Sequence, residues 1–106
     1  MAAKVTDVLP EFSAELIAAL IDQGDVDLAE QIPELRVVAR CGCGDGSCGS
    51  FYVAPRPHGP WGPGHRNVVV DGAKGTVVLD VVNNVITYVE ALERPDVAAL
   101  LRGRES

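Results

Sequence analysis

The chain has 106 residues, of which 47% are hydrophobic and 23% are charged. Domains usually contain about 100–150 residues, so we expect a single domain over residues 1–106 whose core needs neither a metal nor a disulfide. No segment matches a secretory signal, and apolar runs such as Leu16–Ile21 are far shorter than the roughly 20 residues that cross a bilayer. The composition therefore predicts a soluble protein that does not associate with membranes.

The net charge of −6 is concentrated in the N-terminal third of the chain. Residues 1–34 hold one lysine and eight acidic residues, a balance of −7, whereas the remaining chain carries +1. Nucleic-acid binding normally requires a clustered basic face, and the four arginines between residues 35 and 66 are scattered. We therefore expect no nucleic-acid partner.

The N-terminal segment has the periodicity of an amphipathic helix. Five apolar residues recur at three- and four-residue steps: Leu9, Phe12, Leu16, Ile17 and Leu20. This pattern predicts a helix over about Pro10–Gln23. Asp7 is the expected N-terminal cap, and Gly24 supplies the permissive backbone that ends the helix.

A second helix and a first strand are predicted to follow. Asp27 and Glu30 have the spacing of a capping box, which favours a helix over Leu28–Ile32 that Pro33 ends. The period then changes from about 3.6 to 2, so Leu35–Arg40 reads as a half-buried strand. In that strand the alternation places Leu35, Val37 and Ala39 on the buried side.

The C-terminal half is rich in β-forming residues. Four further strands are predicted, over Ser50–Ala54, Val68–Asp71, Gly75–Val82 and Val85–Glu90. Asn83 and Asn84 suit a two-residue hairpin turn because Asn tolerates positive φ. A final helix over Pro95–Arg102 is expected to bury Val97, Leu100 and Leu101. The predicted fold class is α+β: an antiparallel sheet of four to five strands, N-terminal helices packed on one face, and a short C-terminal helix.

The segment Pro55–His65 contains four prolines interleaved with three glycines. Neither a helix nor a central strand tolerates that density, so a long loop is predicted. Trp61 lies within it. We expect Trp61 to anchor the loop to the core, with an exposed contact residue as the alternative.

Three cysteines within eight residues, Cys41, Cys43 and Cys48, form a glycine-rich segment. An odd number of clustered thiols argues against a secreted disulfide framework and for a reducing, cytoplasmic location. Thiolates and imidazoles are zinc ligands, and His58 and His65 lie in the adjacent loop. The candidate metal ligands are therefore Cys41, Cys43, Cys48, His58 and His65, of which at most four would bind one zinc ion.

Other interpretations of this segment stay open. The C-x-C-x4-C spacing lacks the paired C-x2-C units of zinc ribbons, so the cysteines can also pack as small apolar residues in a tight connection. A thiol-dependent enzyme is a further alternative. It is weakened because no C-x-x-C motif stands at a helix N-terminus, where the dipole would lower the pKa of a thiol.

The stretch from Leu35 to Gly44, followed by Phe51 and Tyr52, resembles a group of small uncharacterised bacterial proteins. In that group an N-terminal helical segment leads to an Arg-Val strand, a Cys-x-Cys-Gly turn and a β-rich C-terminal half. The resemblance covers about residues 28–54, with a looser match over 75–92. It implies the same order of elements and no particular activity.

Taken together, the sequence predicts a small cytoplasmic protein-interaction module without catalytic activity. The acidic N-terminal helices or the Pro/Gly loop would contact another protein, since complementary charge speeds association. A domain stabilised by zinc is the alternative, and a thiol-dependent enzyme is the third class.

Overall fold

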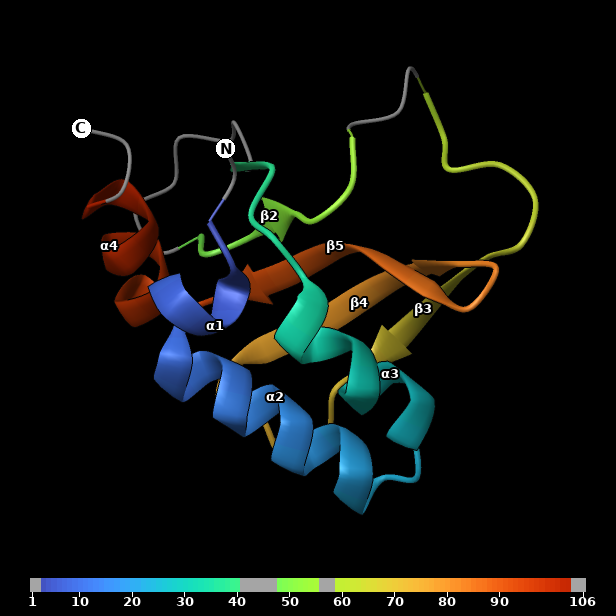
Figure 1. Cartoon of the computed structure of the whole chain (residues 1–106), viewed down its shortest axis with the longest axis horizontal. Coiled ribbons are helices and arrows are strands. Elements are labelled where there is room, and N and C mark those ends of the chain that lie inside the picture. Colours follow the sequence, from blue (N-terminus) through green and yellow to red (C-terminus); the bar gives the residue numbers. More distant parts are fainter. Residues whose placement is uncertain (1–2, 41–47, 56–58, 104–106) are drawn as a thin grey trace.

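The computed structural model describes residues 3–40, 48–55 and 59–103 of the chain. Its helices stand at the two ends of the sequence (Figure 1). They are α1 (Val5–Val8), α2 (Pro10–Asp22), α3 (Val26–Gln31), the 3₁₀ helix η1 (Ile32–Glu34) and α4 (Pro95–Gly103). The predicted first helix is confirmed as α2, and Gly24 follows it with φ +90°, a conformation that glycine adopts without strain.

The strands form one antiparallel sheet in the order β1-β2-β5-β4-β3. They are β1 (Ala39–Arg40), β2 (Phe51–Tyr52), β3 (His65–Val69), β4 (Thr76–Val82) and β5 (Val85–Leu92). The β4–β5 hairpin turns at Asn83 and Asn84, whose φ values of 50° and 66° are those that the sequence predicts for a two-residue turn. The α+β class and the five-stranded antiparallel sheet are thus confirmed.

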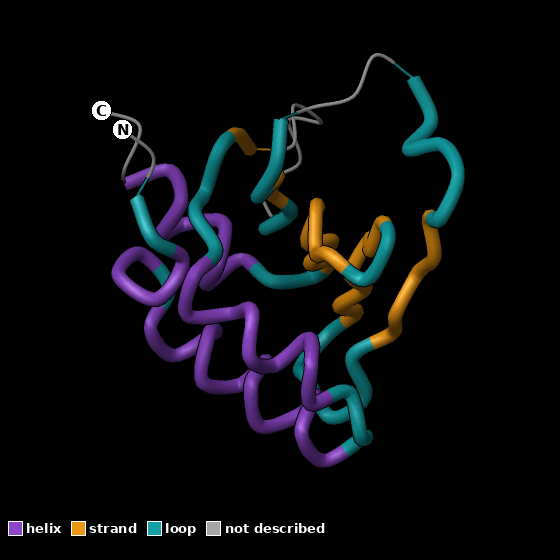
Figure 2. Tube along the Cα trace, turned by 45° about the vertical axis from the view of Figure 1, so that its right-hand side comes forward, coloured by secondary structure: helices purple, strands orange, loops and turns teal. Residues whose placement is uncertain are grey.

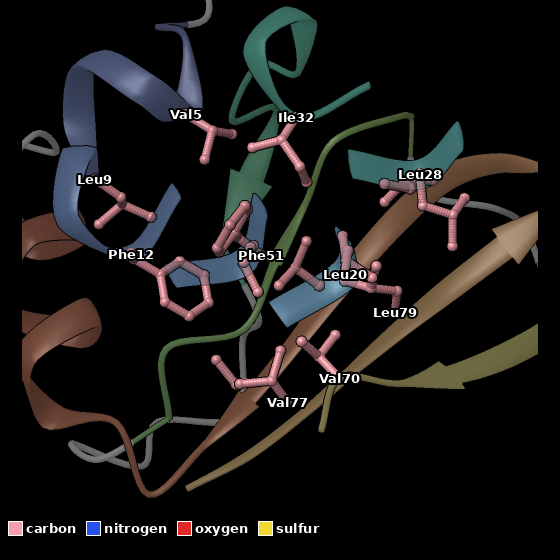
Figure 3. Close-up of a cluster of buried hydrophobic side chains, with 14 of the residues drawn as sticks. Val5, Leu9, Phe12, Leu20, Leu28, Ile32, Phe51, Val70, Val77 and Leu79 are labelled. Atoms are coloured by element: carbon pink, nitrogen blue, oxygen red, sulfur yellow. The ribbon is translucent and has the colours of Figure 1, made fainter. Parts of the chain in front are cut away.

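All helices of the described residues lie on one side of the sheet, which gives the fold two layers (Figure 2). Alternate residues of the strands point into the space between the layers: Val68, Val77, Leu79, Val81, Ile86 and Val89 are buried. Phe51, which is 0% exposed, packs edge-on against Phe12 of α2, with ring centroids 6.4 Å apart. Figure 3 shows Phe12 and Phe51 beside Leu9 and Leu20 in one apolar core.

The segment Leu35–Arg40 differs from its prediction as a continuous strand, because only Ala39–Arg40 joins the sheet. The backbone of its first half is engaged elsewhere. Val5 N–H donates to the Leu35 carbonyl and Val37 N–H donates to the Ala3 carbonyl, so the N-terminal residues compete with the sheet for these groups. Leu35 and Val37 still pack against the core, whereas Ala39 is exposed.

Helix ends also depart from the sequence expectation. Asp7 lies inside α1, and the N-cap position of α2 is Leu9, with no side-chain hydrogen bond. The N-cap of α3 is Asp25, so Asp27 stands in the first turn and the expected capping box does not form. Leu100 is 50% exposed, and Ala98 is buried in its place beside Val97 and Leu101. α4 therefore presents a narrower apolar stripe than expected.

Two glutamines fasten the helical layer to the edges of the sheet. The side-chain amide of Gln23 donates to the Val69 carbonyl at 2.9 Å and accepts from Asp71 N–H at 2.9 Å. Gln31 repeats this arrangement, donating to the Asn84 carbonyl at 2.7 Å and accepting from Ile86 N–H at 2.9 Å. A side-chain amide carries both a donor and an acceptor, so each glutamine satisfies the backbone groups that a neighbouring strand would otherwise satisfy.

Phe51 tests whether the shared core holds the two layers together. Replacing Phe51 by Ala leaves a cavity between β2 and α2, so we expect the free energy of unfolding to fall by about 3–5 kcal/mol. Urea denaturation monitored by circular dichroism measures the change. Leu100→Ala is the control and should change stability by no more than about 0.5 kcal/mol, because that side chain is largely in water. Equal losses in the two variants would contradict the packing described above.

Candidate functional site

The face of the sheet opposite the helices carries a row of side chains that crosses four strands. The register pairs Tyr52 of β2 with Tyr88 of β5, Tyr88 with Asp80 of β4, and Asp80 with Asn67 of β3. Directly opposite residues of an antiparallel pair point to the same face, so these four side chains stand side by side. We call this surface the open face. Among the described elements, every helix lies on the other side of the sheet (Figure 2).

The β3–β4 end of the row is a hydrogen-bonded polar cluster. Asp80 Oδ1 accepts from Asn67 Nδ2 at 2.7 Å and lies 2.6 Å from His65 Nε2. The side chains of His65 and Asp80 are 29% and 16% exposed, so the pair is partly shielded from water. The contact with Asp80 through Nε2 fixes the orientation of the imidazole.

The other end of the row is aromatic. Tyr52 and Tyr88 have ring centroids 4.4 Å apart, and Trp61 lies 6.2 Å from Tyr52. The two tyrosines and the single tryptophan of the chain therefore share one cluster, whereas both phenylalanines belong to the core. Trp61 is half-buried and packs beside Tyr52, so it ties the Pro/Gly loop to the open face and not, as the sequence had predicted, to the core.

Aliphatic residues surround this row. By strand alternation the open face also carries Val69, Val78, Val82, Val85 and Leu92, which we call the open-face patch. Three of its members are largely in water: Val69 is 57% exposed, Val85 56% and Leu92 41%. Large aliphatic side chains gathered on an uncovered sheet face are typical of a surface that binds another molecule.

The structure separates two of the candidate metal ligands. Cys48 is buried beside the β5–α4 corner, where the next residue, Gly49, donates its N–H to the Ala91 carbonyl. His65 begins β3, opposite Val82. Ala91 pairs with Val77 of β4, and Val77 precedes Val82, the partner of His65, along the same strand. At about 3.3 Å per residue the two candidates therefore lie about 16 Å apart along the strands, with β5 and β4 between them. Ligands of one zinc ion lie within about 4.5 Å of each other, so Cys48 and His65 do not share an ion.

The remaining candidates, Cys41, Cys43 and His58, lie outside the described residues. Within residues 3–40, 48–55 and 59–103, no three His, Cys, Asp or Glu side chains are placed to hold a metal ion. A zinc site drawn from Cys41, Cys43, Cys48 and His58 stays a prediction. His65 instead belongs to the open face, as the partner of Asp80.

A second polar cluster lies on the helical side, around Arg94. Its guanidinium uses all five N–H groups: it donates to both carboxylate oxygens of Glu15, to both of Asp96, and to the Lys74 carbonyl, at 2.8–3.1 Å. The same group lies 5.0 Å above the ring of Phe12. Arg94 is 4% exposed, and it joins α2, the β3–β4 turn and the start of α4.

Electrostatics explain why this buried arginine is tolerated. Burial raises the pKa of Glu15, but hydrogen bonds from Arg94 and from Lys74 N–H outweigh that effect and lower it overall. The hydrogen bond from Arg94 likewise lowers the pKa of Asp96. Hydrogen bonds to Asp96 and Glu15 raise the pKa of Arg94, so the three groups stay ionised together at neutral pH. The cluster has every polar group of the arginine satisfied, which marks it as a structural cross-link.

No protein family, curated protein or solved structure matches the chain. The class of molecule is therefore defined by its fold and surface alone: a two-layer α+β domain with one sheet face that no described helix covers. No helix in the part of the chain that the structure describes is long and apolar enough to cross a membrane.

Sequence reasoning did not single out Asp80, Tyr88 or Arg94. A signal existed for the first two, because each stands at an outward position of a period-two strand, between apolar residues that point inward. Arg94 gave no such signal. Its partners Glu15 and Lys74 are 79 and 20 residues away in the sequence, so only the folded chain brings the cluster together.

The Arg94 cluster should make stability depend on acid through Glu15. A carboxylate whose pKa is lowered by folding stabilises the folded state above its unfolded pKa, and this contribution is lost as the pH falls through the folded value. We expect Glu15→Gln to be less stable than wild type at pH 7, with the gap narrowing below about pH 4. Urea denaturation across this range measures it. Glu11→Gln, on the exposed side of α2, is the control, and a Glu15 gap that stays constant with pH would contradict the assignment.

The separation of Cys48 and His65 gives the zinc hypothesis a specific test. In protein purified without chelator, elemental analysis of wild type, His65→Ala and His58→Ala compares the zinc bound per chain. We expect His65→Ala to hold as much zinc as wild type and His58→Ala to hold less, because His58 is the histidine that remains a candidate ligand. A loss confined to His65→Ala would overturn the placement of His65, and wild type with well under one equivalent would end the zinc hypothesis.

Proposed function

We propose that this chain is a non-catalytic protein-interaction module that binds a basic partner protein through its open face. The observation that carries the proposal is the open-face patch, with the aromatic cluster beside it, on a sheet surface that no described helix covers. The cytoplasm is the compartment we propose, from the clustered cysteines of the sequence.

The side chains of the open face suit protein recognition. Aromatic residues are enriched at protein interfaces because they bury a large apolar area with little loss of conformational freedom. Here the aromatic cluster and the polar cluster of His65, Asn67 and Asp80 stand next to each other in the row, and aliphatic residues of the open-face patch flank the row on both sides. Exposed apolar side chains combined with hydrogen-bonding groups are the usual composition of a protein-binding surface.

Charge points to the chemistry of the partner. The open face carries the carboxylates of Asp80 and Glu90, and strands β4 and β5 contain no lysine or arginine. The helical layer adds six exposed acidic residues that form no ion pair within the described residues: Asp7, Glu11, Asp22, Asp27, Glu30 and Glu34. A protein of net charge −6 attracts a basic partner over distances of about 10 Å in 0.1 M salt.

Matched charge insertions test the surface. Val85→Lys places a cation on the open face, and Ile21→Lys places one on the helical layer at a similar exposure, 56% against 53%. Each tagged protein is used to capture binders from native lysate at low and physiological salt, with quantitative mass spectrometry. We expect one basic protein that wild type and Ile21→Lys retain equally and that Val85→Lys loses at least about tenfold.

Three results would count against the proposal. Equal loss with both lysine variants would assign the interaction to overall charge, and a differentially retained protein that is acidic would contradict the charge argument. No differential binder at either salt concentration would remove the open face as a docking surface. Circular dichroism and thermal unfolding of both variants check that the fold is retained, so that a loss of binding can be distinguished from a loss of structure.

A further inference from the structure

The outer edge of β3 has backbone groups that face away from the sheet (Figure 1). Val70 N–H donates to the Val77 carbonyl and Asn83 N–H donates to the Gly64 carbonyl, which sets the alternation of the β3–β4 ladder. Residues 64, 66, 68 and 70 therefore direct their N–H and C=O groups toward β4, and His65, Asn67 and Val69 direct theirs outward.

Gln23 closes one end of this edge and leaves the other end open. Its amide binds the outward carbonyl of Val69 and the N–H of Asp71. The N–H and C=O groups of His65 and Asn67 and the N–H of Val69 have no such partner among the described residues. Five consecutive groups along one edge are a template for another strand, and the exposed side chain of Val69 stands beside them.

The two ends of the open edge carry opposite charge. Arg66 lies at the N-terminal end of β3, where its guanidinium donates only to the Asn84 side chain, at 3.2 Å, and forms no ion pair within the described residues. At the other end, Gln23 Nε2 donates to both the Val69 carbonyl and Asp25 Oδ2, so the Asp25 carboxylate lies next to the end of the strand. Asp71 is exposed at the same end.

We propose that the open edge of β3 pairs antiparallel with the same edge of a second copy of this chain. An antiparallel self-pairing places the basic end of each edge against the acidic end of the other, which a parallel pairing would not do. The occupant is therefore a copy of the chain itself, and the interaction is separate from the binding of a partner protein on the open face.

The register follows from the groups that remain unpaired. Centring the twofold axis on Asn67 gives two hydrogen bonds between Asn67 and Asn67 of the second copy, whose Cα atoms would lie about 5.5 Å apart. Each Val69 N–H then donates to the His65 carbonyl of the other copy, while the Val69 carbonyl keeps its bond from Gln23. Arg66 stands opposite Val68 of the second copy, one residue from the Val69 carbonyl beside which Asp25 lies.

Mass and amide exchange together test this pairing in the intact chain. Light scattering from about 10 µM to about 1 mM should show the mass rising from 11.2 kDa toward twice that value. In dilute solution the amides of Arg66 and Val68 should exchange slowly and those of His65, Asn67 and Val69 rapidly. At high concentration Asn67 and Val69 should become protected, because only self-association provides acceptors for their outward N–H groups.

Variants at the edge separate backbone pairing from a general tendency to associate. Val69→Pro removes one outward N–H without removing a bond to β4, and we expect the dissociation constant of the dimer to rise at least about tenfold. Val69→Thr keeps the N–H and should dimerise like wild type. Arg66→Glu and Asp25→Lys should each weaken the dimer, and the double variant should restore it, because the charge pair is then reversed.

The outcomes are decisive in either direction. A chain that keeps the monomer mass at the highest concentration, or whose outward amides stay unprotected while the mass doubles, overturns the pairing through β3. Restoration by the double charge reversal supports it without reference to Val69→Pro, whose fold could be altered. Loss of the dimer in Arg66→Glu with normal capture of the basic partner would show that the two surfaces are independent, because the Arg66 side chain does not belong to the open face.

Discussion

The arrangement of this molecule depends on the one-sided burial of its sheet. Phe51, Leu79 and Val89 point toward the helices, and strand alternation then obliges Tyr52, Asp80 and Tyr88 to point the other way. A shift of register by one residue would exchange the two sets, placing an aspartate in the core and leaving leucine and valine in water. The apolar core therefore determines which side chains make up the open face, although none of those side chains belongs to the core.

Polar side chains fix the position of the helical layer on the sheet. Gln23 and Gln31 form hydrogen bonds with backbone groups at the sheet edges. Arg94, which lies in the corner between β5 and α4, binds Glu15 of α2. In that corner Gly75 cannot be replaced without strain, because its φ is +68° and a Cβ would lie 2.8 Å from the Leu92 carbonyl. These contacts are directional, so they hold the helical layer in one orientation where aliphatic contacts alone would permit sliding.

The sequence was informative wherever local periodicity and burial agree. The helix over Pro10–Asp22 and the β4–β5 hairpin were predicted because their apolar residues follow one period and their ends carry Gly24 or Asn83. Leu35–Arg40 was mispredicted because the N-terminal residues take its hydrogen bonds, which periodicity does not record.

β3 was predicted to begin at Val68, yet its first three residues, His65, Arg66 and Asn67, are polar and pair with β4 as an edge strand. For the same reason His65 was assigned to a metal site, whereas its partner is Asp80, 15 residues along the chain.

β3 belongs to both surfaces that we propose as binding sites, and its geometry keeps them apart. The side chains of His65, Asn67 and Val69 project from the open face, whereas the backbone groups of the same residues project sideways from the edge. Residues directly opposite in an antiparallel pair point to the same side, so a twofold axis through Asn67 stands perpendicular to the sheet.

The open faces of the two copies then lie side by side as one surface. A partner with two binding segments could engage both, and the second contact would form at the high effective concentration that the first imposes. The proposed pairing at the edge would thus strengthen the proposed binding at the face without any change in the contacts of either one.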